Sequence, residues 1–386
     1  MQSKTGNSKP RFFFIITNPN HHWENSKPLM VELNNRGFDV RLVSFCEMRR
    51  LPNPSNECEK LGFTYYSPFP KIPGTTPASG SATLGAVNSL TRRFLYNFLF
   101  YTYLMPFFSA IVRKGDVVFH YNDVAFPGYI LVPWFLNQGV FQGMLQEGIR
   151  FPLPNATPDI VYGSKGVDIL FCWGKDAKLH FEDLVAPNTK VIISGSPRYQ
   201  AIKNKLKNAQ GSALKIGFFT NPIDDQGYCS YAQKFELFEQ VIQKIAPVLQ
   251  KQQITLLLKT HVREKIEPYC EILEKYQIGF EVGNKDIFSL IAEVKGGIIF
   301  ASSVGLEMLF LGKNIAQVQL PGFGYVFDYV ENQVALPIAK ETAGIDIVQY
   351  LLRESNAIND TYLSRHLSPE IDSVSIICNT LINREV

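Results

Sequence analysis

The stretch GGIIFASSVGLEMLFLGKNIAQVQL, residues 296–320, predicts a strand, a helix and a second strand in direct succession. The runs 296–303 and 314–320 are short and apolar, whereas 304–312 has the length of a helix that packs on them. Two strands joined by one crossover helix pair in parallel, and a parallel sheet is covered by helices on both faces. The stretch therefore indicates an α/β fold.

The same alternation extends from this unit toward both ends of the chain. Further strands are expected at 11–18, 38–45, 63–69, 117–123, 141–148, 168–174, 190–195, 214–221, 254–261 and 278–283. Further helices are expected at 24–36, 86–112, 124–138, 175–186, 230–250, 264–276, 286–293, 343–353 and 367–383. A polar stretch at 201–213 is the expected linker between a first domain at 1–200 and a second at 214–345. Residues 346–386 are expected to form C-terminal helices, for which packing back on the first domain is one arrangement.

Length and composition agree with two globular domains. The chain has 386 residues, of which 46% are hydrophobic and 19% are charged. Its net charge of +3 comes without a basic block, which argues against a nucleic-acid partner. The six cysteines are scattered and form no CxxC pair, which argues against a disulfide scaffold or zinc site and fits a reducing cytosol. No signal peptide is recognisable, so a cytoplasmic location is expected.

An aromatic segment, RRFLYNFLFYTYLMPFFSAIVRK at 92–114, carries no charge between Arg93 and Arg113 and is nearly long enough to span a membrane. Asn97, Pro106 and the strand that follows favour a helix buried in the protein. A helix that rests on a membrane surface is the second alternative, because Phe and Tyr with flanking Arg suit that place. A transmembrane span is the third.

Polar residues follow several strands of the second half, at the edge where ligands of parallel sheets bind. They are Thr220 and Asn221, Lys259, Thr260 and His261, and Ser302 and Ser303. Cations at one strand end and hydroxyls beside a helix N-terminus at another are suited to hold a phosphate. Gly305 lies at the start of that helix, and Glu307 in its first turn can accept hydrogen bonds from a ribose. The alternative is that the serines only cap the helix and that Lys259 and Arg263 are solvated.

The first half offers a second set of polar residues near strand ends. Candidates for the acceptor side or the cleft are Asn20, Gln146, Glu147, Gly148, Arg150, Ser196 and Arg198. His21 and His22 follow the first strand as well, whereas His120 lies within a strand and is expected in or near the core. The loop 70–85 is rich in Pro, Gly, Ser and Thr and is expected to be a lid or a disordered insert. The sequence has no Asp-x-Asp run of the kind that holds a metal, and none is expected.

These residues resemble the motifs of a known group of enzymes. The order Lys-x-His at 259–261, Ser-Ser-x-Gly-Leu-Glu at 302–307 and Leu-Gly-Lys at 311–313 is similar to the C-terminal half of GT-B glycosyltransferases. The similar stretches of the first half are QEGI (146–149), DILFCWGKDAKLHF (168–181) and KVIISGSPRY (190–199). The resemblance covers 141–325 and is closer to bacterial enzymes of surface-polysaccharide assembly. These are the capsule-synthesis proteins, sialyltransferases, β-Kdo transferases and, more distantly, the CDP-glycerol polymerases.

The resemblance implies the GT-B fold, in which two Rossmann-like domains face each other across a cleft. It implies an inverting, metal-independent transfer, without a cofactor, of a sialic-acid-like or Kdo-like sugar from a CMP-activated donor. The acceptor would be a hydroxyl of a cell-surface glycan or glycolipid precursor. Carried over to this sequence, Glu147 is the general base, while His261 and the pair Ser302 and Ser303 stabilise the leaving phosphate. Lipid-linked acceptors would bring the protein to the inner face of the membrane, with 93–112 as the contact.

Two positions depart from the motifs and leave other functions open. Gln146 stands where the sialyltransferases have the first of two acidic residues, and Val262 follows His261 where they have proline. Alternatives on the same fold are a CDP-polyol phosphotransferase and a UDP-sugar glycosyltransferase or UDP-sugar 2-epimerase. The alternative from another class is a GT-B module that binds glycan or a partner enzyme without catalysis.

Overall fold

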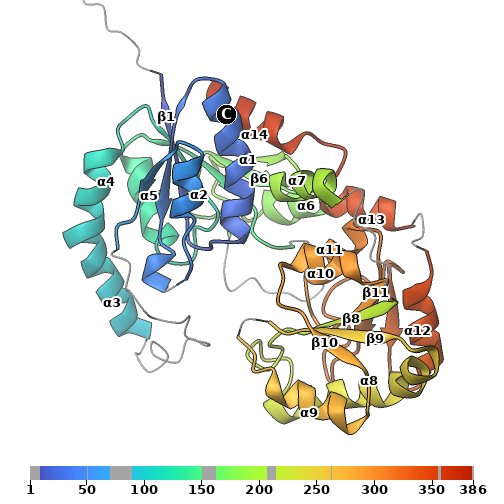
Figure 1. Ribbon diagram of the computed structural model, residues 1–386. Helices are drawn as coiled ribbons and strands as arrows, with labels where there is room; N and C mark the ends of the chain where they lie inside the picture. The colour runs from blue at the N-terminus through green and yellow to red at the C-terminus, as the bar shows by residue number, and fades with distance from the viewer. Residues whose placement is uncertain are drawn as a thin grey trace, which may run out of the picture. The chain divides into compact units, whose positions relative to one another are not determined.

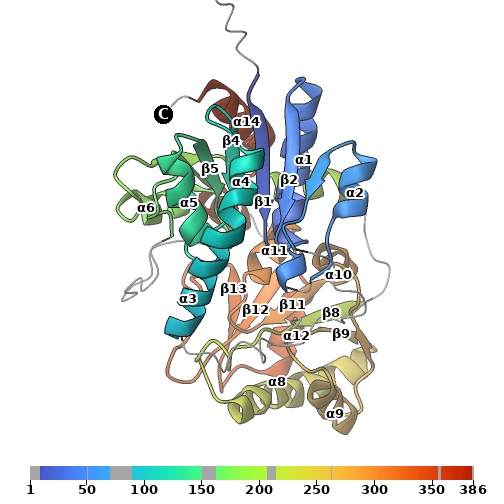
Figure 2. The same cartoon turned by 90° about the vertical axis from the view of Figure 1, so that its left-hand side faces the viewer.

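A computed structural model of the protein describes residues 9–49, 51–69, 89–149, 162–206, 214–261, 263–354 and 358–384 (Figures 1 and 2). The chain forms two compact units, which we call unit 1 (Met1–Ala201 with Ser364–Val386) and unit 2 (Ile202–Leu363). The loop expected at 70–85 lies outside the described residues, as do residues 207–213 of the expected linker. Residues 201–206 of that linker form the end of a helix.

Unit 1 is built on a seven-stranded sheet with the strand order β3-β2-β1-β4-β5-β6-β7. The strands are β1 (Arg11–Ile16), β2 (Asp39–Ser44), β3 (Thr64–Tyr66), β4 (Val117–His120), β5 (Phe141–Leu145), β6 (Ile169–Cys172) and β7 (Lys190–Ile193). All neighbouring strands pair in parallel, and five of the six residues of β1 are buried. The strand order changes direction between β1 and β4, which makes the carboxyl ends of these two strands the expected ligand-binding edge.

Helices cover the sheet of unit 1 (Figure 2). They are α1 (His21–Asn35), α2 (Ser55–Lys60), α3 (Ser89–Leu99), α4 (Met105–Ile111), α5 (Gly128–Asn137), α6 (Lys175–Glu182), α7 (Pro197–Leu206) and α14 (Ser373–Asn383). The C-terminal helix α14 packs on α1, where the thiol of Cys378 lies 3.8 Å from the carbonyl oxygen of Leu29. Helix α13 (Ile358–His366) carries the chain from unit 2 back into unit 1.

Unit 2 repeats the architecture with a six-stranded parallel sheet in the order β10-β9-β8-β11-β12-β13. Its strands are β8 (Lys215–Phe219), β9 (Thr255–Lys259), β10 (Phe280–Val282), β11 (Gly296–Ile299), β12 (Asn314–Val318) and β13 (Ala335–Ile338). Its helices are α8 (Tyr231–Gln252), α9 (Glu267–Lys275), α10 (Ile287–Glu293), α11 (Val304–Phe310) and α12 (Gly344–Leu352). The strand order changes direction between β8 and β11. The predicted α/β class is confirmed in both units.

Some elements were missed because their sequences contradict the usual pattern. Strand β13 contains Pro337, which argues against a strand, but β13 lies at the edge of the sheet, where proline is tolerated. Helix α2 is short and mostly polar. Helices α7 and α13 are not among the helices that the sequence predicts, and α7 overlaps the polar stretch expected as the linker.

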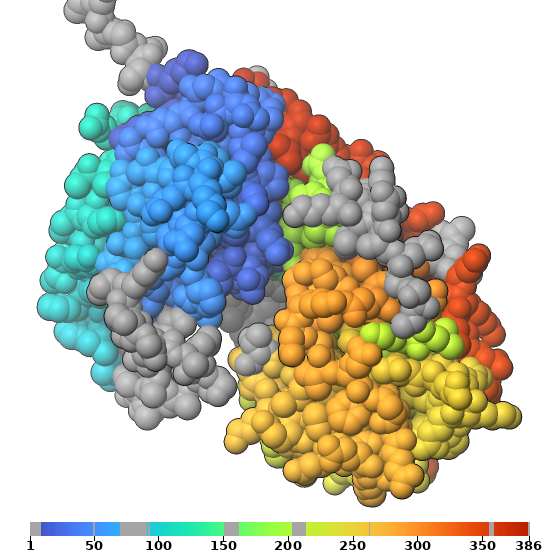
Figure 3. Space-filling view, in the orientation of Figure 1, coloured from blue at the N-terminus to red at the C-terminus, as the bar shows by residue number. Residues whose placement is uncertain are grey.

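The prediction of a buried helix at 92–114 is wrong for most of its length. The segment runs as α3, a π-helical turn (Phe100–Leu104) and α4, and only 17% of its most apolar window is buried. Figure 3 shows this segment, coloured teal, at the surface of unit 1. Phe100, Leu104 and Phe108 face the core, while the opposite side of the helix is exposed. By length and composition, Arg93–Ile111 could cross a membrane.

Candidate active site

The carboxyl ends of β1, β4 and β5 surround a small cavity in unit 1. Its volume is about 80 Å³, and polar groups of Thr17, His22, Asn122 and Glu147 line it. Its apolar lining comes from Ile15, Ala125, Phe126 and Pro127. The cavity therefore lies at the edge of the sheet where the strand order changes direction.

Glu147 is held in this cavity by two hydrogen bonds. His22 Nε2 lies 2.9 Å from Oε1 of Glu147, and Asn122 Nδ2 donates to Oε2 at 3.0 Å. The backbone N–H of Thr17 donates to Nδ1 of His22 at 3.1 Å. Since Nδ1 accepts this bond, the proton of the neutral imidazole is on Nε2, which donates to Glu147. The side chain of His22 is only 2% exposed, whereas that of Glu147 is 31% exposed.

This geometry assigns different roles to the two residues. Both ring nitrogens of His22 are already engaged, so His22 has none left for a substrate. Each carboxylate oxygen of Glu147 keeps a lone pair beyond the bond that it accepts. Glu147 is therefore the member of the pair that can take a proton from a bound hydroxyl, and His22 positions it.

The environment of Glu147 keeps its carboxylate ionised. Burial alone would raise the pKa of Glu147, but the hydrogen bond and the charge interaction with His22, followed by the hydrogen bond from Asn122, outweigh burial and lower this pKa below its ordinary value. The neighbouring His21 stays neutral, because burial, and then the positive charge of Arg198, lower its pKa to about 3. Near neutral pH this edge therefore presents an ionised carboxylate beside a neutral His21.

The turn after β5 explains why glutamine precedes Glu147. The side chain of Gln146 is buried and donates from Nε2 to the carbonyl oxygen of Gly148 at 2.8 Å, while its Oε1 accepts from the backbone N–H of Trp173 at 2.8 Å. An ionised carboxylate could not make the donated bond. Gly148 has a φ of +72°, in the left-handed region that glycine favours. Gln146 and Gly148 therefore shape the turn that presents Glu147.

The other candidates of the first half lie around α1. Ser196 donates to Asn25 at 3.0 Å, and Arg198 forms an ion pair with Glu24, so both tie the start of α7 to α1. Asn20 is exposed and precedes α1. Arg150 lies outside the described residues. Because α1 also carries His22, the contacts of Ser196 and Arg198 support the helix that positions Glu147.

In unit 2, the ends of β8 and β11 are joined by a side-chain bond. Asn221 Nδ2 donates to the carbonyl oxygen of Ala301 at 2.7 Å, across the point where the strand order changes direction. Ser302 is buried and its hydroxyl accepts from the backbone N–H of Val304 at 3.3 Å. The hydroxyl of Ser303 is at an exposed residue and makes no capping bond to α11. Ser302 thus makes a local turn, whereas the Ser303 hydroxyl does not cap α11 and is exposed.

The start of α11 is packed tightly against Tyr329. A Cβ on Gly305 would lie 2.8 Å from the Tyr329 ring, so this position needs glycine. The Tyr329 hydroxyl accepts from the backbone N–H of Leu306 at 3.1 Å and donates to the carbonyl oxygen of Ser302 at 3.3 Å. Glu307 is 7% exposed. Gly305 and Glu307 therefore lie inside the packed start of the helix, which sets the position of the two serines.

The end of β9 presents two nitrogen groups. The backbone N–H of Arg263 donates to Nδ1 of His261 at 3.2 Å, so neutral His261 carries its proton on Nε2. Burial, and then the charge of Arg263, lower the pKa of His261. Burial also lowers the pKa of Lys259, which forms no ion pair with any residue that the structure describes. Together with the half-buried Thr260, these groups offer N–H and O–H donors at one strand end.

Glu264 fixes this strand end, a role that the sequence did not reveal. Its side chain is 1% exposed and accepts hydrogen bonds from Thr220 Oγ1 at 2.6 Å, from Tyr269 Oη at 2.7 Å and from the backbone N–H of His261 at 3.1 Å. Lys234 Nζ lies 3.3 Å away and also pairs with Asp224 at 2.8 Å. One carboxylate thus joins the ends of β8 and β9 to helices α8 and α9.

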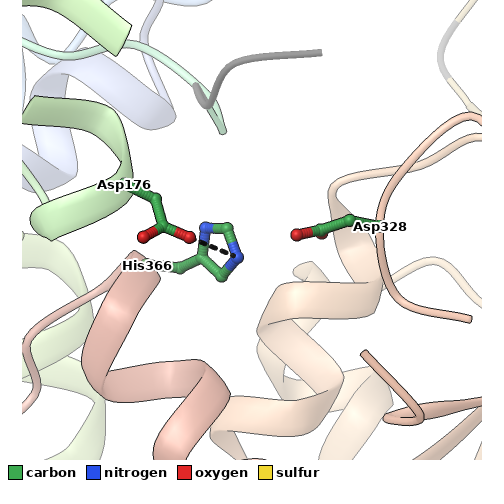
Figure 4. A group of neighbouring side chains, drawn as sticks. All are labelled: Asp176, Asp328 and His366. Atoms are coloured by element: carbon green, nitrogen blue, oxygen red, sulfur yellow. Dashed lines mark ion pairs between the residues drawn. The ribbon is translucent and has the colours of Figure 1, made fainter. Parts of the chain in front are cut away.

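A further charged group lies in unit 1, on α6 and the C-terminal segment (Figure 4). Arg365 binds both oxygens of Asp176, at 2.6 and 3.2 Å, and His366 Nε2 lies 3.6 Å from the same carboxylate. Figure 4 also draws Asp328, a residue of unit 2 that accepts a hydrogen bond from Tyr362 at 2.5 Å. The bidentate pair between Arg365 and Asp176 anchors the C-terminal segment to unit 1.

Solved structures with the same fold match nearly the whole chain. A putative UDP-N-acetylglucosamine 2-epimerase from Listeria monocytogenes has a TM-score of 0.55 and 13% identity, over 98% of this chain and 94% of that one. UGT73P12 from Glycyrrhiza uralensis, complexed with glycyrrhetinic acid 3-O-monoglucuronide, has a TM-score of 0.56 and 10% identity, over 98% and 96%. UGT71G1 from Medicago truncatula, complexed with UDP-glucose, has a TM-score of 0.53 and 12% identity, over 97% and 98%.

At the level of sequence, no protein-family model matches the chain, and no curated protein matches it significantly. The structural likeness at such low identity defines the fold and leaves the chemistry to the residues. The expected GT-B fold, with two parallel-sheet units, is confirmed.

The depressed pKa of Glu147 predicts a pH-dependent contribution to stability. This contribution is fully present above the ordinary glutamate pKa of about 4.3 and is lost as the pH falls toward the lower pKa of the folded protein. We expect the free energy of unfolding to be higher for the wild type than for Glu147→Gln at neutral pH, and the difference to shrink below about pH 4. Urea unfolding across this range measures it. A difference that stays constant down to about pH 3 would contradict the assignment.

Removal of the Glu264 carboxylate should destabilise unit 2. We expect Glu264→Ala to lower the free energy of unfolding by about 3 kcal/mol or more, because Lys234 stays buried and several donors lose their acceptor. The matched control is Glu239→Ala, which breaks an exposed pair with Lys275 and should change stability little. Urea unfolding of both variants provides the comparison. Equal effects of the two substitutions would show that Glu264 has no special structural role.

Proposed function

We propose that the protein is an inverting, metal-independent glycosyltransferase that moves a sugar from a nucleotide-activated donor to an acceptor hydroxyl. The observation that carries this proposal is the ionised Glu147 carboxylate, oriented by His22 and Asn122 at the ligand-binding edge of unit 1. The GT-B fold, which UDP-sugar-binding neighbours share, supports it. In this proposal unit 1 binds the acceptor and unit 2 binds the donor.

The proposed reaction is a single displacement. Glu147 takes the proton of the acceptor hydroxyl as the oxygen attacks the anomeric carbon. The bond between that carbon and the phosphate oxygen breaks, and the negative charge stays on the nucleotide phosphate. One attack from the opposite side inverts the configuration at the anomeric carbon. The depressed pKa of Glu147 makes it a weak base that is nevertheless always ionised near neutral pH.

The proposed phosphate site uses the donors at the strand ends of unit 2. His261 Nε2–H, Lys259 and the Ser303 hydroxyl would stabilise the charge that develops on the leaving phosphate. Thr220 and Asn221 hold the neighbouring strand ends in place. No step needs a metal.

For the donor, we propose a CMP-activated sugar of the sialic-acid or Kdo type. The support is the order of the motifs around Glu147, His261 and the serine pair, which resembles that of the bacterial surface-polysaccharide enzymes. The second candidate is a UDP-sugar glycosyltransferase or UDP-sugar 2-epimerase. It is favoured by the similar structures, one of which is complexed with UDP-glucose and one of which is named a putative UDP-N-acetylglucosamine 2-epimerase.

For the acceptor, we propose a hydroxyl of a cell-surface glycan or glycolipid precursor. Such acceptors are lipid-linked, so the protein would work in the cytoplasm at the inner face of the membrane. The segment 93–112 of unit 1 would make the contact.

Nucleotide binding tests the donor site directly. We expect CMP at a hundred times its Kd to add about 2.7 kcal/mol to stability and to raise the Tm by several degrees, and His261→Ala to abolish the shift. Thermal unfolding with CMP, CDP, UMP, UDP and GDP measures it. Glu147→Gln is the matched control, because it should retain the nucleotide shift while losing sugar transfer.

Each outcome of this experiment decides something. A preference for UDP would favour the UDP-sugar candidate, and a preference for CDP would favour the polyol phosphotransferase. No shift with any nucleotide would overturn the phosphate site at Lys259, His261 and Ser303. Retention of transfer in Glu147→Gln would overturn the role of Glu147 as the base.

A further inference from the structure

The segment from α3 to α4 exposes a continuous aromatic surface on unit 1. Phe94, Phe98 and Tyr101 are 70%, 60% and 62% exposed. Spacings of four and three residues place them on one side of a helix. Leu95 and Tyr103 are exposed as well. We call these five residues the aromatic face. Its size is unusual, because water-exposed surfaces rarely gather so many large apolar side chains.

The opposite side of the same helix is firmly built into unit 1. Phe100, Leu104 and Phe108 are fully buried with Phe45 and Phe135 in one hydrophobic cluster. The π-helical turn Phe100–Leu104 adds a residue to one turn of the helix, where these buried positions begin. The aromatic face is thus the outer side of a well-packed helix and does not result from loose packing.

The charges of the segment that carries the aromatic face have a single sign. From 86 to 115 the sequence contains no aspartate or glutamate. Arg93, Arg113 and Lys114 are exposed, and none forms an ion pair with a residue that the structure describes. The nearest following acid, Asp116, is paired with Arg11. Arg93 directly precedes the aromatic face, and Arg113 and Lys114 follow the C-terminal end of α4. An exposed apolar strip on a segment whose charges are all positive suits a surface with an apolar interior and negatively charged headgroups.

We propose that the aromatic face binds an anionic membrane surface, with the helix lying in the plane of the interface. Phenylalanine and leucine side chains would enter the acyl region, tyrosines would lie at headgroup depth, and Arg93 and Arg113 would contact lipid phosphates. The helix does not span the membrane, because that would pull Phe100, Leu104 and Phe108 out of the core of unit 1.

The cations argue against a second copy of this chain as the occupant. Two copies of the aromatic face would bring Arg93, Arg113 and Lys114 of one chain toward the same residues of the other. Like charges that meet without compensation oppose association, whereas anionic headgroups neutralise them. The inference adds the residues, the lipid charge and the helix orientation to the membrane contact of the proposed function. It does not require that the protein transfers sugar.

Vesicle binding of the full-length protein tests the inference. We expect co-sedimentation with phosphatidylcholine vesicles that contain phosphatidylglycerol, and little with phosphatidylcholine alone. Binding should weaken as salt rises, because the electrostatic part is screened. Phe94→Ser with Phe98→Ser should weaken binding about tenfold or more, and Arg93→Glu should weaken it at low salt.

The matched control is Leu179→Ser, which alters an exposed leucine on α6 of the same unit and should leave vesicle binding unchanged. Circular dichroism spectra like that of the wild type would show that the variants fold. The vesicle assay contains no donor or acceptor. Its failure therefore overturns this inference and the proposed membrane contact of 93–112 but not the proposed sugar transfer, and an absence of sugar transfer leaves the membrane inference standing.

Three results would overturn the inference. The double variant could bind vesicles as strongly as the wild type. Both the wild type and the double variant could remain on the vesicles at about 1 M salt, where charges are screened beyond about 3 Å. Such salt-resistant binding would indicate a helix that spans the membrane. Finally, the wild type could self-associate in the absence of lipid and lose this in Phe98→Ser, which would assign the aromatic face to a second copy.

Discussion

Parallel pairing of the strands is the constraint from which the rest of each unit follows. Every neighbouring pair in the two described sheets is parallel, so every connection must cross over the sheet, and helices that make these connections cover both faces. All strands of a sheet then end at the same edge. In unit 1 this edge collects Thr17, Asn122 and Glu147, and in unit 2 it collects Thr220 and His261, although these residues are far apart in sequence.

The two edges use hydrogen bonds in opposite ways. In unit 1, the side chains of His22 and Asn122 donate to one carboxylate, and His22 has no nitrogen left for a ligand. This arrangement orients the Glu147 carboxylate, a group that can accept a proton. In unit 2, the buried Glu264 accepts from the backbone N–H of His261, and the imidazole Nε2–H has no hydrogen-bond partner among the residues that the structure describes. That arrangement orients a group that can donate a hydrogen bond, which is the role in the proposed phosphate site. A reaction that takes a proton from one substrate and releases a phosphate from the other needs both kinds of group.

Sequence patterns revealed the strands well and the contacts of the site poorly. Buried parallel strands are continuous apolar runs, so β1 and β11 were recognisable, whereas Pro337 hid the edge strand β13. Glu147 could be found because a polar turn follows its strand. Its partner His22 lies 125 positions away, and only the folded sheet brings the two together. Glu264 follows a run of cations, and the sequence does not show that Lys234 is buried beside its carboxylate.

The aromatic segment at 92–114 is another case in which the sequence does not reveal the contacts of a residue. An uncharged stretch between Arg93 and Arg113 suits a core helix, an interfacial helix and a membrane span equally, because composition does not say which side of the helix meets the protein. The structure separates these cases by burial: Phe100 and Leu104 lie in the core, whereas Phe94 and its neighbours do not. Exposing them to water forgoes roughly 25 cal/mol for each Å² of apolar surface that could be buried. A contact outside the chain that buried these side chains would recover that free energy, which is the physical basis of the proposed membrane contact.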